Sequence, residues 1–255
     1  MTLDDLLPVY DVDDEVAVTV AAPPGVVYDA LMAADLIDVG RRRPLVGVLG
    51  GLRMLPDLVA RILRGEPPAP MPQTLRLGDL AGQPVAEGGW SLLAEEPGAW
   101  IALGLVGRFW KPVIEWADVP AERFAAFDEP GWAKTVYALG VRPLPDGRTL
   151  LTGTMRTATT DERARRWFRR YWTLGVGSGA HEVVRALLEC VREDAEARAR
   201  ARASGESGAS EDDQTSAGRP SASEPASATR RRQGSSRMTA ASGEPGPPGN
   251  SVAGS

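Results

Sequence analysis

The stretch of sequence that decides the fold runs from Phe127 to Ser178 and reads FDEPGWAKTVYALGVRPLPDGRTLLTGTMRTATTDERARRWFRRYWTLGVGS. Two runs typical of β-strands, 132–141 and 149–159, lie on either side of PLPDGR, whose Asp-Gly pair is a strong signal for a hairpin turn. An arginine-rich amphipathic segment follows directly and is typical of a helix. This order predicts an α+β fold in which a curved antiparallel sheet closes around a long C-terminal helix and leaves an apolar cavity between them.

The C-terminal helical region carries the clearest periodicity in the chain. Its apolar positions recur at helical spacing and are Ala180, Val183, Val184, Leu187, Leu188 and Val191. The joint GVGSG precedes this stripe, and each of its three glycines costs a helix about 1 kcal/mol relative to alanine. We therefore expect a kink or a break in the helix at residues 175–179.

The first half of the chain predicts one strand, two helices and then a series of short strands. Alternating valines indicate a strand at 15–20, Pro24 suits the first turn of a helix, and 45–64 shows helical spacing after an expected loop at 41–43. Further short strands are expected at 74–80, 88–95, 99–106 and 124–127. The predicted sheet therefore has about six or seven strands.

Composition separates a folded domain at residues 1–200 from a tail at 201–255. The tail is rich in Ser, Gly, Pro and Ala and has almost no large apolar side chains, which predicts disorder. The net charge of −5 argues against nucleic acid as a partner, and no cofactor or metal is indicated. Cys190 is the single cysteine, and the acidic start resembles no signal peptide, so a cytoplasmic location is expected. The apolar stretch 45–63 is too interrupted by charge and proline for stable membrane insertion.

Three local motifs carry a resemblance to a known superfamily. They are GRFW at 107–110, FAAFDEPGWAK at 124–134 and TDERARRWFRRYW at 160–172. Together with the order of the elements, they resemble an actinobacterial group of the SRPBCC, or START-like, superfamily (polyketide cyclase/dehydrase-like). The resemblance spans about residues 8–200 and implies the helix-grip fold, whose members include lipid carriers, hormone receptors, polyketide aromatase/cyclases and chaperone co-activators. One departure is Thr154, where such proteins commonly carry a glutamate two residues before the arginine that is here Arg156.

Two polar residues are candidates for contact with a ligand. Arg156 should share one face of its strand with Thr152 and Thr154. If that face lines the cavity, the Arg156 guanidinium can bind a carboxylate or phosphate of a ligand. Otherwise a neighbouring acid or solvent satisfies the guanidinium. His181, the one histidine, lies beside the apolar stripe just after the glycine joint. It either faces the cavity or is a packed or solvent-edge residue. Neither residue has partners that would form a typical catalytic or zinc site, so no catalytic or metal-binding residue is assigned.

Aromatic side chains are the remaining candidates. Trp100, Trp132, Tyr137 and Trp167 belong to an aromatic-rich domain in which most rings pack in the core, while a subset lining a pocket would suit a flat or hydrophobic ligand. The arginines of 163–170 form a solvated face or, alternatively, a surface for a partner protein.

These observations favour a binding module for a small apolar or amphipathic ligand. The alternatives are a cyclase- or dehydratase-type enzyme, with His181 or Tyr137 as acid or base and Arg156 assisting, and a protein-interaction module. A further hypothesis makes 45–63 a movable cover over the cavity mouth, against a fixed helix that caps the sheet edge.

Overall fold

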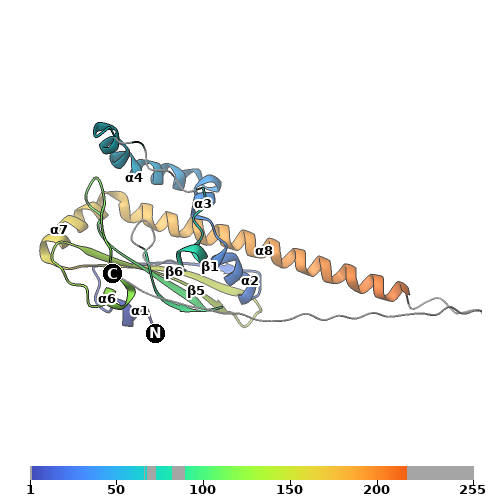
Figure 1. Cartoon of the computed structure of the whole chain (residues 1–255). Helices are drawn as coiled ribbons and strands as arrows, with labels where there is room; N and C mark the ends of the chain where they lie inside the picture. The colour runs from blue at the N-terminus through green and yellow to red at the C-terminus, as the bar shows by residue number, and fades with distance from the viewer. Residues whose placement is uncertain (1, 66, 68–72, 82–89, 217–255) are drawn as a thin grey trace, which may run out of the picture. The chain divides into compact units, whose positions relative to one another are not determined.

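The computed structural model describes residues 2–65, 67, 73–81 and 90–216. The chain divides into two units, residues 1–211 and 212–255, and the fold below is that of the first. It is an α+β fold with a curved antiparallel sheet and a long C-terminal helix (Figure 1). The predicted tail lies outside the described residues from 217 onward.

Six strands form one sheet, within the predicted six or seven, although β4 was not among the expected strands. They are β1 (Val12–Val20), β2 (Ser91–Glu96), β3 (Trp100–Arg108), β4 (Glu115–Ala117), β5 (Ala133–Pro143) and β6 (Thr149–Thr159). The order across the sheet is β1-β6-β5-β3-β2, with β4 paired to β3, and every pairing is antiparallel. The β5–β6 hairpin turns at Gly147, whose φ of 80° is a conformation that glycine adopts without strain.

The two faces of the sheet bury different clusters of side chains. On the inner face, alternate residues such as Leu103, Leu139 and Leu151 join a core that also contains the C-terminal helix. On the outer face, Ala102, Val136 and others pack against the two shortest helices, α1 (Leu3–Leu6) and α6 (Ala121–Phe124). The phase of the strands therefore decides which side chains can reach a cavity beneath the helix.

The C-terminal helix α8 (Gly177–Ser216) runs along the inner face of the sheet (Figure 1). Gly153 of β6 permits the close approach: a Cβ at this position would lie 2.7 Å from Val184 Cγ1. The helix continues past the expected domain boundary at residue 200. Residues 195–203 are mostly alanine and arginine, which both have high helix propensity.

Four helices lie between β1 and β2 in the chain, and their positions correct two predictions. They are α2 (Pro24–Met32), α3 (Leu36–Arg42), α4 (Pro44–Leu63) and α5 (Leu77–Ala81). The loop expected at 41–43 is wrong, because α3 includes Arg42, whose Nη1 lies 2.9 Å from Asp194 Oδ1 of α8. The strand expected at 74–80 is also wrong. Only residue 76 forms a bridge, and the chain then enters α5 to bury Leu77 in the core.

The strand expected at 124–127 is wrong as well. Pro120 starts the helix α6 there instead, and the helix buries Phe124 against the outer face of the sheet. A run of apolar residues this short fits a buried helical turn as well as it fits a strand. The strands predicted at 15–20, 99–106, 132–141 and 149–159 are confirmed. The strand predicted at 88–95 corresponds to β2, and residues 88 and 89 lie outside the described part of the chain.

The glycine joint interrupts the C-terminal helical region, as predicted. Helix α7 (Glu162–Tyr171) is followed by a kinked segment, η1 (Trp172–Val176), before α8 begins. Inside η1, Leu174 and Gly175 leave helical geometry, and Gly175 has a φ of 98°. The kink lies at the edge of a cavity, which Trp172, Leu174 and Gly175 help to line.

Candidate functional site

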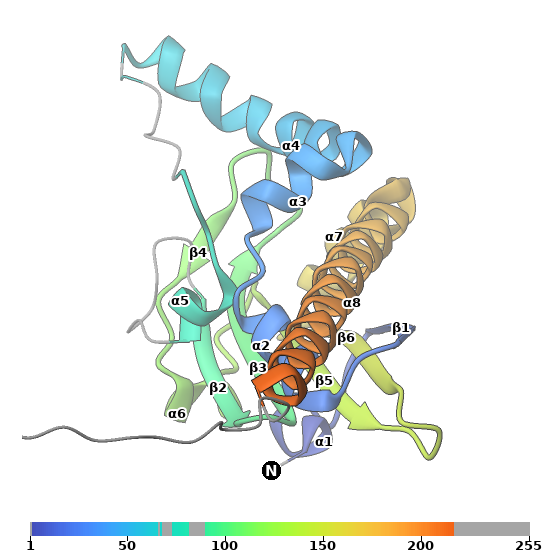
Figure 2. The same ribbon diagram turned by 90° about the vertical axis from the view of Figure 1, so that its right-hand side faces the viewer.

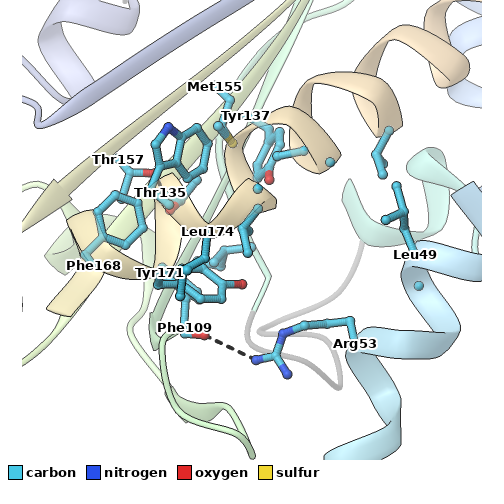
Figure 3. A pocket seen from close by; sticks show the side chains of 18 of the residues that line it. Leu49, Arg53, Phe109, Thr135, Tyr137, Met155, Thr157, Phe168, Tyr171 and Leu174 are labelled. Atoms are coloured by element: carbon cyan, nitrogen blue, oxygen red, sulfur yellow. Dashed lines mark hydrogen bonds between the residues drawn. The ribbon is translucent and has the colours of Figure 1, made fainter.

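A cavity of about 530 Å³ lies between the inner face of the sheet and the joint of α7, η1 and α8, with α4 on its remaining side (Figure 3). Its lining side chains are mostly apolar or aromatic. They include Leu49, Trp90, Leu105, Phe109, Trp116, Met155, Phe168, Tyr171, Trp172, Leu174 and Val183. The cavity that the sequence predicted beneath the helix is therefore present.

The floor of the cavity comes from alternate residues of β5 and β6. Thr135 and Tyr137 of β5, with Met155 and Thr157 of β6, point inward. The hydroxyl groups of Thr135 and Thr157 lie 2.8 Å apart and satisfy each other, although both side chains are buried. The floor is thus apolar in character with one self-contained polar pair.

Aromatic rings form one wall. Phe168 lies 5.7 Å from Trp172 and 6.4 Å from Tyr171 between ring centroids, and all three rings come from α7 and η1. Across the cavity, Trp90 contacts Tyr137 with centroids 5.5 Å apart. These separations are typical of tilted aromatic pairs, which give the site rigid, flat surfaces.

Tyr137 carries a hydroxyl that is free for a ligand in this cavity. Burial raises the pKa of its hydroxyl to about 12, and the neighbouring Tyr171 and Asp14 add to the rise. None of the described residues forms a hydrogen bond with this hydroxyl. The group is therefore held neutral at ordinary pH and can donate a hydrogen bond to a bound molecule.

The joint between α7 and α8 shapes one edge of the cavity. A Cβ at Gly177 would lie 2.6 Å from the Trp172 ring, so only glycine lets this ring fold back against the start of α8. Leu174, at the non-helical point of η1, lines the cavity while 84% of its surface stays exposed. A side chain in this position forms part of a rim rather than part of a core.

Helix α4 contributes the last side of the cavity and one cation. The guanidinium of Arg53 donates to three backbone carbonyls of the β3–β4 connection: Phe109 at 3.3 Å, Lys111 at 3.3 Å and Pro112 at 3.1 Å. Figure 3 shows the bond to Phe109. Its buried Nε has no hydrogen-bond partner among the described residues. Arg53 thus ties α4 to the body of the fold and keeps one donor unused beside the cavity.

Arg156 does not line the cavity, which corrects its prediction as a ligand contact and leaves the other alternative, pairing with neighbouring acids. Met155 and Thr157 face inward, so Arg156 faces outward with Thr154. Its guanidinium pairs with Asp4 and with Asp13, and the ring of Tyr10 lies 4.5 Å from Cζ. The inner positions are taken by the residues that pack under α8, which leaves the polar alternate positions for the outer face.

His181 lies outside the apolar cavity as well. Its Nδ1 is 3.0 Å from Asp14 Oδ1, and the side chain is 40% exposed. Both residues line a separate, polar hollow that shares only Trp172 and Gly175 with the cavity. The pair links β1 to α8 just beyond the joint.

Three of the predicted aromatic residues are elsewhere. Trp100 packs on the outer face and its indole N–H donates to Glu96 at 3.3 Å. Trp132 also packs there, with Arg108 stacked 4.3 Å from its ring centroid. Trp167 is exposed on α7 beside Arg170. Of the six predicted site residues, Tyr137 alone lines the cavity.

The residues missed by the sequence reasoning have recognisable signals in part. Phe168, Tyr171 and Trp172 follow the helical period of the arginine-rich segment, so their common face was readable. Met155 and Thr157 required the inward phase of β6, and Arg53 required the tertiary position of α4. The inward phase of β6 and the position of α4 are set by packing between segments distant in the sequence, and not by the pattern of neighbouring residues.

The rest of the described chain adds three observations. On α7, Arg165 forms ion pairs with Asp11 and Glu162, so part of the arginine face is already paired. Within the described residues, no group of three or more His, Cys, Asp or Glu side chains could hold a metal ion. None of the helices in this part of the chain combines the length and apolar character needed to cross a membrane.

Comparisons with known proteins give little further information. No family model and no curated protein matches the chain. Among solved structures, the chain is similar to the protein TTHA0849 from Thermus thermophilus, with 15% sequence identity and a TM-score of 0.27 over 73% of this chain and 99% of that one. At this TM-score the match carries no argument about function.

Proposed function

We propose that this chain is a binding protein for a small apolar or amphipathic ligand. The observation that carries the proposal is the cavity of about 530 Å³ with its aromatic wall and apolar floor. Ligand sites in proteins generally enclose about 300–1,000 Å³ and combine apolar walls with a few placed polar groups. The cavity has both properties.

The polar groups at the cavity favour a ligand with one acceptor group on a mostly apolar body. The Tyr137 hydroxyl is a donor without a partner among the described residues. The Thr135–Thr157 pair already satisfies itself. A carbonyl, hydroxyl or carboxyl oxygen next to Tyr137, with the hydrocarbon part against Phe168 and Trp172, would fit this distribution.

We further propose that the fold is a helix-grip fold of the SRPBCC, or START-like, superfamily. Support comes from the order of elements, with helices after the first strand, a run of antiparallel strands and a C-terminal helix along the inner face. The motifs at 107–110, 124–134 and 160–172 point the same way. Two of them flank the cavity through Phe109, Phe168 and Trp172.

Binding is favoured over a cyclase- or dehydratase-type reaction. Proton transfer to or from a substrate requires a group within hydrogen-bond reach of it. His181 and Arg156 both lie outside the cavity, which leaves Tyr137 without the acid–base partners first considered. A raised hydroxyl pKa suits a hydrogen-bond donor rather than a base at neutral pH.

Native mass spectrometry of freshly purified protein tests the proposal directly. The expected result is a bound mass of lipid-like size, retained under gentle conditions and lost on unfolding. Ala180 of α8 lines the cavity, so Ala180→Phe should fill it and abolish the bound mass. Ala197→Phe, at an exposed position of the same helix, is the matched control and should retain it. Empty wild-type protein that also fails to bind fatty acids or aromatic probes would overturn the proposal.

A further inference from the structure

Helix α4 presents a continuous apolar stripe to solvent. The stripe consists of Leu45, Val48, Leu52, Leu55, Val59 and Ile62, and is here called the α4 seam. The exposed fractions of these six residues lie between 47% and 61%. Single exposed apolar residues are ordinary, but a contiguous patch of this kind marks a surface that contacts something else.

The spacing of the seam indicates that its partner is another helix. The six residues are separated by three, four, three, four and three positions, which is the a/d pattern of a coiled-coil heptad. A helix that simply packs on a globular core shows a wider stripe with a period of 3.6 residues. A strict repeat of 3.5 residues is typical of two helices that supercoil around each other.

The seam does not face the cavity of its own chain. Val46 packs on the core, and Leu49 and Arg53 line the cavity, so these residues define the inner side of α4. Each of the seam residues Leu45, Val48 and Leu52 precedes one of them by one position, which is a rotation of about 100° around the helix. The side of α4 that lines the cavity and the seam are therefore two separate faces of one helix. Figure 2 shows the position of α4 beside α3.

Helix α4 is intrinsically weak and gains from a partner. Gly47, Gly50 and Gly51 each disfavour helix by about 1 kcal/mol, and Pro56 lies inside it. The contacts that hold it to the rest of the chain include α3 at its start and the Arg53 carbonyl bonds. Burial of the seam would supply stabilisation that the monomer lacks.

We propose that α4 pairs through its seam with α4 of a second copy of this chain. The undescribed stretches 68–72, 82–89 and 217–255 are poor occupants, because their large apolar side chains are just Met71, Val85, Met238 and Val252. The heptad positions that flank the seam, Leu49, Gly51, Pro56, Leu58 and Leu63, carry no charge. Charges at these positions normally select a foreign partner or exclude self-pairing, and their absence leaves identical helices compatible.

A lipid surface fits the composition of α4 less well. Helices that lie in a membrane interface are rich in basic residues on their polar face and usually carry aromatic anchors. Residues 44–63 contain no Trp, Tyr, Phe or Lys, and the chain has a net charge of −5. Anionic lipid would therefore repel the chain as a whole.

The exposed apolar area is of the size that a dimer requires. The six seam residues, with Leu58 and Leu63 beside them, are all more than a third exposed. Full burial of one such side chain removes on the order of 100 Å² from water, so the eight together reach several hundred Å² per copy. A stable interface buries about 800 Å² per partner, a value of the same order once flanking backbone is included.

Pairing through the seam would also fix the cover of the cavity. The inner side of α4 contributes Leu49, Gly50 and Arg53 to the lining, so a partner that orders α4 orders that side of the site. The dimer does not depend on which ligand the cavity holds, or on whether it holds one.

Sedimentation velocity of the full chain over a range of concentrations tests the dimer. The wild type should reach the mass of two copies at micromolar concentration. Leu52→Glu should raise the dissociation constant by about two orders of magnitude because it places a charge in the seam. Val9→Glu is the matched control: Val9 is 76% exposed but lies outside α4, and its substitution should leave the dimer unchanged.

Two further measurements make the result decisive. Leu52→Cys combined with Leu55→Cys should cross-link two copies under mild oxidation in either relative orientation of the helices, since the native Cys190 is buried. Val9→Cys should not cross-link. A wild type that stays monomeric at all concentrations would overturn the proposal, and so would a monomer that floats with vesicles of phosphatidylcholine and phosphatidylglycerol.

Discussion

Helices α4 and α8 both carry an apolar stripe, but their environments are opposite. The stripe of α8 is buried on the sheet: Leu188 has no exposed surface, and Val184 and Leu187 join the same core. The stripe of α4 is exposed along the whole helix. Apolar residues at helical spacing thus predict that a helix exists, but they do not show whether the surface that packs against it belongs to the same chain.

The difference has a physical origin in the surface that each helix meets. Opposite α8, the sheet offers Gly153, which lets the helix approach until Val184 touches the strand. Opposite α4, the chain offers the rim of a cavity and three carbonyls for Arg53. One helix therefore closes the core, and the other borders a space that remains open.

Truncating one leucine in each stripe should give the largest difference in the free energy of unfolding. Leu188→Ala should lower the free energy of unfolding by about 2–5 kcal/mol, because it leaves a cavity between α8 and the sheet. Leu52→Ala, on the exposed stripe, should change it by less than about 0.5 kcal/mol in dilute solution, where self-association does not contribute. Urea denaturation of both variants measures the difference. Equal losses would show that α4 is as much a part of the core as α8.

Hydrogen exchange should separate the two helices without any mutation. Amides of 45–63 should exchange about a hundredfold faster than those of 180–192, since low-stability elements open without global unfolding. Addition of a ligand for the cavity should slow the α4 amides, because Leu49, Gly50 and Arg53 line the site. Equal protection in both segments, with no effect of ligand, would make α4 a fixed cap rather than a movable cover.

Substitution of two glycines should distinguish the close contact between α8 and the sheet, at Gly153, from the looser contact between α8 and α4, at Gly179. Gly153→Ala should destabilise the fold by about 1–3 kcal/mol, because the new Cβ would lie 2.7 Å from Val184 Cγ1 and 3.3 Å from Leu139 Cδ2. Gly179→Ala meets no atom closer than Leu49 Cδ1 of α4 at 3.8 Å, so the gain in helix propensity should dominate and stabilise by up to about 1 kcal/mol. Thermal unfolding followed by circular dichroism compares them. Changes in stability of the same sign in both variants would contradict the proposed difference in packing.

The sequence predicted the elements whose evidence is local. The alternation of β5 and β6, the Asp146-Gly147 turn and the glycine joint at 175–179 each lie within a few residues, and all are found where expected. The strands expected at 74–80 and 124–127 failed because short apolar runs satisfy a helical turn equally well. There the buried side chains Leu77 and Phe124, and not the period, decide the structure.

The candidate site was predictable in kind but not in detail. Alternation shows that β6 has two faces, but it does not say which face meets α8. The apolar residues Leu150 and Leu151 occupy both faces, and only Leu151 is fully buried. The sequence therefore left open whether Arg156 lines the cavity, and it does not, whereas Tyr137 was correctly associated with the cavity. The contribution of Arg53 depends on where α4 folds back, and no local pattern contains that information.

The smallest expected effect concerns Tyr137 in the floor of the cavity, with Tyr28 as its counterpart in the filled core. Burial is the first cause for both residues, and it raises the pKa of each hydroxyl from 10.0 to about 12. The unfolded chain therefore loses these protons at lower pH than the folded chain does. Stability from the neutral hydroxyls is complete below pH 10 and is lost as the pH rises toward about 12.

Phenylalanine substitutions separate the two tyrosines. Tyr28 donates to Glu95 at 2.8 Å, so Tyr28→Phe should cost about 1 kcal/mol at neutral pH as well as flattening the alkaline decline. Tyr137 has no hydrogen-bond partner among the described residues, so Tyr137→Phe should be close to neutral at pH 7 and should flatten the decline alone. Urea denaturation between pH 8 and about 11.5 measures both slopes. A Tyr137→Phe variant that loses stability at pH 7 would reveal a hydrogen bond to that hydroxyl and would remove it as the free donor for a ligand.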